Sequence, residues 1–199
     1  MLSHDVRILS INQLGRTVFS EFANPCRAAR RHMFELQREG LVKIVDAFVH
    51  PELELDSPLF VWMPGDSTPM FELLAWLTSS RWTQSPAPTT LVHATKEAAK
   101  VFGGYSAGRV PRRTEVCHDL HLAQVYLTLR RDRPSYAKRW MSEQAQYARG
   151  GGRNERLPDA IIRGRRKPID RIIEFAGSYS KAKLREMHAA FCHVPYELW

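Results

Sequence analysis

The segment 24–64, NPCRAARRHMFELQREGLVKIVDAFVHPELELDSPLFVWMP, decides our interpretation of the N-terminal fold. Asn24 is a favoured residue for capping a helix N-terminus, and Pro25 suits the first turn because its missing N–H costs nothing there. Gly40 suits a helix end. The spacing therefore predicts a helix that runs from Pro25 to Glu39. Two apolar runs typical of strands follow it, at 41–49 and 58–63, with an acidic, proline-containing turn between them.

The predicted helix has an apolar face and a basic face. Ala29, Met33 and Leu36 lie together and are expected to pack inward. Four arginines project from the other side, with Phe34 among them: Arg27, Arg30, Arg31 and Arg38. Guanidinium groups contact phosphates and can read guanine in the major groove. The basic face is therefore our candidate surface for double-stranded DNA.

A second helix is expected upstream of this one. Ser10 followed by Gln13 forms a capping box, and one apolar stripe recurs at Ile11, Leu14, Val18 and Phe22. Helix, turn, helix and β-hairpin is the order of a winged helix-turn-helix, in which the second helix is the recognition helix. Two alternatives stay open: a small α+β module whose arginines are merely solvated, and a winged fold used for dimerisation.

The charge distribution favours a polyanionic partner. The 199 residues carry a formal net charge of +8. Residues 1–70 contain 7 basic and 9 acidic side chains, whereas residues 71–199 contain 22 basic and 12 acidic ones. Such an excess attracts nucleic acids by releasing their counterions. A soluble basic protein without a nucleic-acid partner is the alternative.

Composition excludes several other classes. The hydrophobic share of 44% and the charged share of 25% are ordinary for a globular protein. No apolar run approaches the roughly 20 residues that span a bilayer, so no membrane partner is expected. Three cysteines without a CxxC pair do not form a disulfide framework, which indicates a reducing, cytoplasmic setting.

The sequence suggests three regions. We expect a winged-helix domain at 1–70, a helical linker region at 71–113 and a second domain at 114–199. The Ser/Thr/Pro-rich stretch 79–90 is the best linker candidate. Thr95 is expected to cap a short helix that ends before the glycine pair at 103–104.

The second domain carries a pair of carboxylates. Its expected elements are, in order, a helix from Asp119 that ends near Pro134, three strands, a helix at Lys181–Phe191 and a short strand at Tyr196–Trp199. Asp159 begins the second strand, and Glu174 lies near the end of the third. Carboxylates on adjacent strands can bind Mg²⁺, which would polarise a phosphodiester and generate hydroxide. Glu143 could supply a third carboxylate.

These residues resemble those of known families. The spacing Pro158-Asp159…Glu174 is similar to the core of PD-(D/E)xK nucleases. A larger set resembles the replication-relaxation family: His118-Asp119-Leu120, Trp140 with Glu143, Pro158-Asp159-Ala160, Glu174 and Lys181…Leu184. That family pairs a winged helix with a degenerate nuclease-like α/β domain, so the resemblance implies an α+β fold of this kind. It also implies DNA binding in the replication, maintenance, transfer or regulation of plasmids and other mobile elements.

One position departs from the nuclease pattern. The motif has a lysine two residues after the glutamate, where this chain has Ala176. That lysine stabilises charge that develops at the phosphate. Lys181 or Lys183, at the start of the last helix, could reach back to replace it. Otherwise Asp159 is a turn residue, and Glu174 forms an ion pair with an arginine.

Two further groups of residues complete the candidates. Zinc is a rival metal because a set of Cys and His side chains lies close in sequence: Cys117, His118, His121, Cys192 and His193. Two basic clusters are expected to flank the carboxylates and follow a phosphate backbone: Arg163, Arg165, Arg166 and Lys167, and also Arg130, Arg131 and Arg133. Either cluster could instead be a solvated surface.

The sequence thus predicts a DNA-binding protein of a mobile element. A Mg²⁺-dependent DNA endonuclease that uses Asp159, Glu174 and Lys181 or Lys183 is one competitor. A non-catalytic interaction scaffold, with a homodimer formed through the winged helix, is the other.

Overall fold

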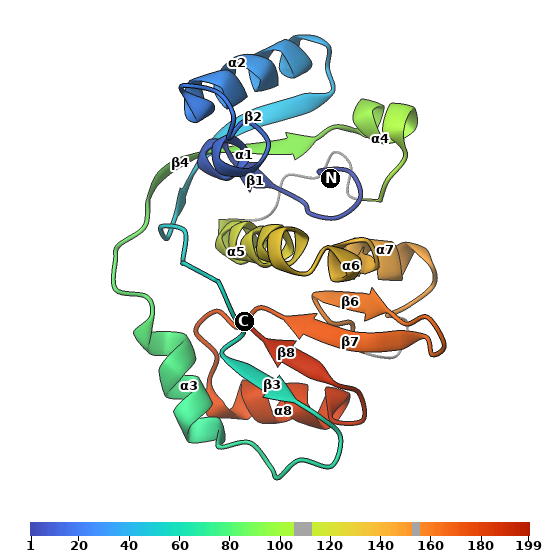
Figure 1. The fold of residues 1–199 in the computed structure, drawn as a ribbon. Coiled ribbons are helices and arrows are strands. Elements are labelled where there is room, and N and C mark those ends of the chain that lie inside the picture. The colour runs from blue at the N-terminus through green and yellow to red at the C-terminus, as the bar shows by residue number, and fades with distance from the viewer. Residues whose placement is uncertain (106–112, 153–155) are drawn as a thin grey trace. The chain divides into compact units, whose positions relative to one another are not determined.

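Residues 1–105, 113–152 and 156–199 are described by the computed structural model, with side chains from residue 115 onward in the second range. The fold is mixed α+β, with two sheets (Figure 1). The chain divides into two compact units, which we call unit 1 and unit 2. Unit 1 comprises Met1–Glu52 and Ser85–Leu127, and unit 2 comprises Leu53–Gln84 and Thr128–Trp199.

Unit 1 contains a three-stranded antiparallel sheet and several helices. Its elements are β1 (Leu9–Ser10), α1 (Ile11–Thr17), α2 (Pro25–Arg38), β2 (Val42–Val49), β4 (Ala87–Ala94), α4 (Lys96–Phe102) and the first part of α5 (Arg113–Asp132). The strand order is β1-β4-β2. One buried cluster joins the sheet to α5 through Ile8, Val49, Leu91, Val116 and Leu120.

Local sequence signals account for the helix starts in unit 1. The side chain of Ser10 accepts from the Gln13 N–H, and the Gln13 side chain accepts from the Ser10 N–H, so the expected capping box is confirmed. Asn24 caps α2 by accepting from the Arg27 N–H. Thr95 caps α4 in the same way. The helix expected from Pro25 is thus confirmed, and it ends one residue earlier than expected.

The expected pairing of the two apolar runs is wrong. β2 forms eight backbone pairs with β4, from Val42↔Ala94 to Val49↔Ala87. The second run instead supplies β3 (Phe60–Trp62), which pairs with β8 (Tyr196–Leu198) in unit 2. β4 begins inside the Ser/Thr/Pro-rich stretch, whose composition hides it. Because its second half is apolar and buried, pairing and packing outweigh the weak local preference.

Unit 2 is built on a five-stranded sheet. Its elements are β3, α3 (Phe71–Ser80), the last part of α5, α6 (Pro134–Ala137), β5 (Trp140–Ser142), α7 (Glu143–Ala148), β6 (Ala160–Arg163), β7 (Ile169–Glu174), α8 (Lys181–Phe191) and β8. The strand order is β3-β8-β7-β6-β5, in which only the β7–β8 pair is parallel.

The core of unit 2 lies between this sheet and two helices. α8 lies along one face of the sheet and connects the parallel strands β7 and β8 (Figure 1). Its inward residues are Leu184, Met187 and Phe191. α3 packs beside α8 and contributes Phe71 and Leu74 to the same cluster. The expected bounds of α8 are confirmed, and the short final strand ends at Leu198, one residue earlier than expected.

The two units differ from the three regions expected at 1–70, 71–113 and 114–199. Residues 53–84 belong to unit 2 because β3 pairs with β8 and α3 packs on α8. Residues 106–112, at the end of the expected linker region, lie outside the described residues. Within the described chain, no helix combines the length and the apolar character needed to cross a bilayer.

Candidate functional site

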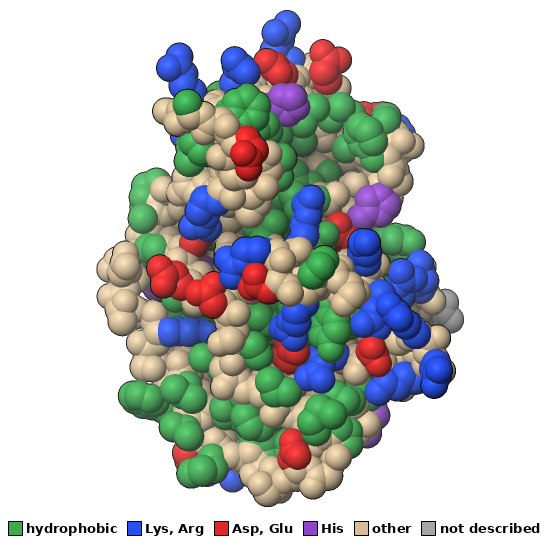
Figure 2. All heavy atoms as spheres, viewed as in Figure 1, with side chains coloured by type: hydrophobic (Ala, Val, Ile, Leu, Met, Phe, Trp, Pro, Cys, Tyr) green, Lys and Arg blue, Asp and Glu red, His purple; other side chains and the backbone are tan. Residues whose placement is uncertain are grey.

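Helix α2 presents a basic surface because its opposite side is anchored. Ala29 and Met33 are its buried residues, with 0% and 5% of their surface exposed. The four arginines expected at the DNA surface are all exposed: Arg27, Arg30, Arg31 and Arg38. Figure 2 shows basic side chains projecting at the top of the view, where Figure 1 places α2.

None of these four arginine side chains forms an ion pair with another described residue. Glu35, the acidic residue within this helix, lies 3.5 Å from His32. Glu39 lies at the end of the helix, as its C-cap residue. The guanidinium groups are therefore available to an external anion. This is the arrangement that phosphate contact requires.

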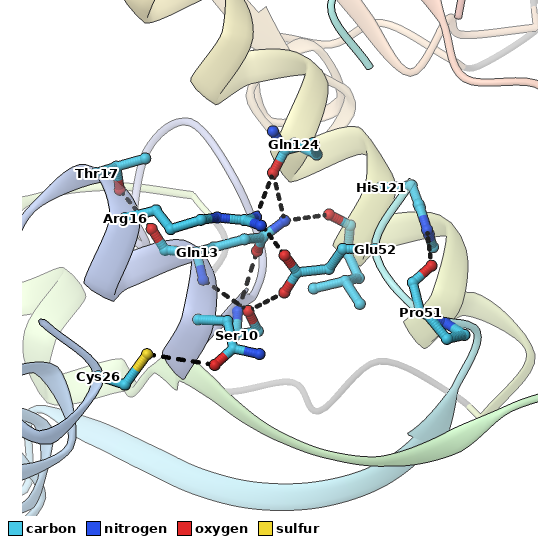
Figure 3. Close-up of polar contacts among 11 residues, drawn as sticks. Ser10, Gln13, Arg16, Thr17, Cys26, Pro51, Glu52, His121 and Gln124 are labelled. Carbon is cyan, nitrogen blue, oxygen red and sulfur yellow. Dashed lines mark hydrogen bonds and ion pairs between the residues drawn. The ribbon is translucent and has the colours of Figure 1, made fainter. Parts of the chain in front are cut away.

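Helix α1, which packs against α2, is held by a polar network (Figure 3). Glu52 accepts hydrogen bonds from both Ser10 and Arg16. The Gln13 amide donates to the Leu120 carbonyl at 3.0 Å and to the Gln124 side chain at 3.3 Å. These contacts hold α1 against α5, and α2 packs on α1.

The zinc candidates are divided between the two units. Cys117 and His121 belong to unit 1, whereas Cys192 and His193 belong to unit 2. The two ring nitrogens of His121 lie 2.7 Å and 3.1 Å from the carbonyl oxygens of Cys117 and Pro51, the second of which appears in Figure 3. Burial raises the pKa of Cys117, which favours the thiol over the thiolate that binds zinc.

Unit 2 brings Asp159 and Glu174 together as expected. Asp159 directly precedes β6, and Glu174 ends β7, on adjacent antiparallel strands. The Asp159 N–H donates to Glu174 Oε1 at 3.2 Å, and the Phe175 N–H donates to Asp159 Oδ2 at 2.8 Å. Glu174 is only 1% exposed. These reciprocal bonds hold the carboxylates at one end of the strand pair.

Three side chains surround this carboxylate pair. Arg156 Nη2 lies 3.6 Å from Glu174 Oε2, and Lys183 Nζ lies 3.7 Å from the centre of the Tyr179 ring. Burial of the Tyr179 hydroxyl raises its pKa, and the charges of Asp159 and Glu174 raise it further. Tyr179 therefore stays protonated beside the carboxylates.

Lys183 interacts electrostatically with Asp159 and Glu174. It is exposed over much of its side chain, yet partial burial lowers its pKa, and Arg156 adds to this lowering. Asp159 and Glu174 act in the opposite direction and favour the charged ammonium. Lys181 instead forms an ion pair with Glu72 of α3. Of the two expected lysines, the structure therefore places Lys183 near the pair.

The departure at Ala176 has a physical reason. This residue is fully buried in the core cluster of unit 2, where a charged lysine side chain would lose its water. Glu143 begins α7 and is exposed, and its N–H donates to the Asp159 carbonyl at 3.0 Å. The described residues contain no group of three or more Cys, His, Asp or Glu side chains placed to hold a metal ion.

The basic clusters do not flank the carboxylates. The group Arg163, Arg165, Arg166 and Lys167 is exposed in the turn between β6 and β7. Asp159 lies at the other end of β6, about 13 Å from Arg163 at the rise of an extended strand. Figure 2 shows a basic region at the right of the view, where Figure 1 places this turn and α7.

The second cluster is neutralised within unit 2. Arg131 pairs with Asp56 and Asp132, and Arg133 makes two hydrogen bonds to Glu197 at 2.6 Å and 2.8 Å. Arg133 is therefore part of the fold, and a phosphate would have to compete with a buried carboxylate for it. That nucleic acid follows these arginines stays a prediction.

Sequence reasoning missed Arg156 and Tyr179 as neighbours of the carboxylates. The available signal was proximity along the chain, since Arg156 lies three residues before Asp159, and Tyr179 lies just before α8.

Comparisons with protein-family models, curated proteins and solved structures find no match to this chain.

Proposed function

We propose that this protein binds double-stranded DNA through helix α2 of unit 1. The observation that carries the proposal is that four α2 arginines are exposed and unpaired among the described residues: Arg27, Arg30, Arg31 and Arg38. Exposed guanidinium groups along one helix can contact phosphates on both sides of a groove and reach base edges between them.

The topology of unit 1 supports the same proposal. The order β1, α1, α2, β2, β4 with a β1-β4-β2 antiparallel sheet is compatible with a winged helix-turn-helix, in which α2 would be the recognition helix. The β2–β4 pair would supply the wing. The resemblance to the replication-relaxation family adds the proposal that the DNA belongs to a plasmid or other mobile element.

Salt dependence tests the proposal most directly. We expect affinity for a 24-base-pair duplex, measured by fluorescence anisotropy, to fall steeply between 50 and 200 mM salt. Arg31→Gln should weaken binding and reduce the slope of log affinity against log salt by about 1, because one phosphate contact is lost.

Arg165→Gln is the matched control, because it removes the same charge from the exposed turn in unit 2. It should change affinity less than Arg31→Gln. Absent or salt-insensitive binding would reject DNA binding by α2, and the reverse order of the two variants would move the interface to unit 2.

A second candidate function is metal-dependent hydrolysis of phosphodiesters in unit 2. The helix, three strands, helix and strand, with β8 parallel to β7, follow the order of the PD-(D/E)xK core. Asp159 and Glu174 offer the hard oxygen ligands that Mg²⁺ takes, although each already accepts a main-chain hydrogen bond. A bound Mg²⁺ would supply Lewis-acid polarisation of a phosphate. Lys183 would hold a positive charge beside the phosphate, the role of the motif lysine that this chain replaces by Ala176.

Cleavage of plasmid DNA with Mg²⁺ or Mn²⁺ tests this candidate. Asp159→Asn and Lys183→Gln should each abolish the reaction. Glu72→Gln, which removes a carboxylate that pairs with Lys181 elsewhere in unit 2, should leave it intact. No cleavage by the unaltered protein with either metal would reject the enzyme and leave DNA binding standing.

A further inference from the structure

The exposed ridge of α2 contains an aromatic side chain that the fold does not use. Successive residues of an α-helix turn by about 100°, so the side opposite Ala29 and Met33 carries a set spaced at i, i+4, i+7 and i+11. The members of this ridge are Arg27, Arg31, Phe34 and Arg38. Phe34 therefore stands in line with three arginines.

Phe34 contributes little to the stability of unit 1. Half of its surface, 50%, is exposed, and the buried residues of α2 are Ala29 and Met33. Phe34 does not belong to the buried cluster that joins the sheet to α5. Because the ring stands among arginines, a partner that contacts the whole ridge would be both anionic and locally apolar.

Duplex DNA meets both conditions in its major groove. Its phosphates are anionic, and the methyl group of thymine is the apolar group that the major groove presents. Along the helix axis Phe34 lies about 4.5 Å from Arg31 and about 6 Å from Arg38. Base pairs are stacked about 3.4 Å apart, so the ring falls within about two base pairs of either arginine contact.

We propose that Phe34 packs against a thymine methyl group and gives α2 a preference for duplexes that carry thymine at that position. This inference rests on the proposed DNA binding and names the base that the helix prefers. The arginines then supply affinity for any duplex, and Phe34 supplies discrimination between sequences.

The test compares two duplexes that differ only in the methyl groups. One is a 24-base-pair duplex of alternating A·T pairs, so that every register offers a thymine, and the other carries deoxyuridine at each thymine position. We expect the unaltered protein to bind the thymine duplex about fourfold more tightly. This follows from about 0.8 kcal/mol for burying one methyl-sized group and a factor of ten for each 1.4 kcal/mol.

Variants assign the preference to the ring. Phe34→Ala should bind both duplexes equally while its salt dependence stays unchanged, because no charge is lost. Phe102→Ala is the control, since Phe102 is another exposed phenylalanine of unit 1, at the end of α4, and it should keep the fourfold preference.

The other outcomes overturn the inference in distinguishable ways. If the unaltered protein binds both duplexes equally, or Phe34→Ala keeps the preference, Phe34 does not read thymine, although salt-dependent DNA binding still stands. If neither duplex binds, the proposed function and this inference both fail. If Phe34→Ala only converts a dimer to a monomer in sedimentation, the ring belongs to a protein interface and the inference fails.

Discussion

The arginines of helix α2 in unit 1 and those near Glu197 and Asp170 in unit 2 are used in opposite ways. On α2 they are exposed and unpaired among the described residues, with Arg31 as the representative case. In unit 2, Arg133 binds Glu197, and Arg139 pairs with Asp170 at 2.6 Å. Unit 2 contains most of the basic excess of the sequence, yet much of that charge is neutralised internally. Net charge therefore does not locate the surface that is free to bind an anion.

Glu197 shows why Arg133 and Arg171 are structural. Its carboxylate is 2% exposed and accepts hydrogen bonds from Arg133 and from the Trp199 indole at 3.0 Å. Arg171 lies 3.4 Å from the same carboxylate. The hydrogen bonds to Glu197 raise the pKa of Arg133, which therefore stays charged. A buried carboxylate needs such partners because it has lost its water.

The largest expected effect separates these two kinds of arginine by stability. Arg133→Met should destabilise unit 2 by about 3 kcal/mol, because it removes the bidentate partner of a buried charge. Arg31→Met should change the stability of unit 1 by less than about 0.5 kcal/mol, as surface substitutions do.

Tryptophan fluorescence during urea unfolding reports on unit 2, because all five tryptophans lie there: Trp62, Trp76, Trp82, Trp140 and Trp199. Hydrogen exchange of the β2–β4 amides reports on unit 1. Equal losses of stability in the two variants would contradict the distinction between structural and available arginines.

The next effect compares two adjacent residues of α2. Met33→Ala should destabilise unit 1 by about 2–3 kcal/mol, because Met33 is buried and its removal leaves a cavity. Phe34→Ala should cost less than about 0.5 kcal/mol, because its ring is half exposed. Hydrogen exchange of unit 1 measures both, and a large loss in Phe34→Ala would mean that the ring supports the fold.

A smaller effect concerns the caps of the helices that present the two candidate sites. Asn24→Ala at α2 and Ser180→Ala at α8 should each cost about 1 kcal/mol, because each leaves a main-chain N–H without its acceptor. The first should appear in the exchange of unit 1 and the second in the fluorescence of unit 2. A loss that appears in the other unit would show that the two unfold together.

The smallest expected effect is a pH dependence in each unit. Burial lowers the pKa of His93 in unit 1 and of His188 in unit 2. The folded protein therefore binds fewer protons than the unfolded chain as pH falls below 6.5, the ordinary value of histidine. Stability should decrease from about pH 6.5 downward, through the lowered pKa of the folded state.

His93→Gln should flatten the pH dependence of exchange in unit 1, and His188→Gln should flatten that of the fluorescence transition in unit 2. Asp and Glu titrate lower, so the measurement is confined to pH 5.5–7.5. Unchanged slopes in both variants would contradict the assignment.

Much of the candidate chemistry could be predicted from local patterns. The cap at Asn24 and the capping box of Ser10 and Gln13 each depend on neighbours a few residues away. For the same reason the arginine face of α2 and the spacing of Asp159 and Glu174 were visible in the sequence. The sequence left two candidates, Lys181 and Lys183, for the lysine near the carboxylates, because a loop separates the end of β7 from the start of α8.

Pairings over long distances could not be predicted. β2 pairs with a strand about 40 residues away rather than with the adjacent apolar run. Whether an arginine is free depends on acids such as Glu197, which lies 64 residues from Arg133. No short-range pattern encodes such partners.

The amino-acid sequence alone specifies the helices, the caps, the basic face of α2 and the two carboxylates, because helix periodicity and capping act within one or two turns. Tertiary structure decides that residues 53–84 join unit 2, that Lys183 rather than Lys181 approaches the carboxylates, and that Arg133 is structural while Arg31 is exposed. The reason is physical: strand pairing, burial and ion pairing depend on distances in space, and the folded chain sets those distances between residues far apart in sequence.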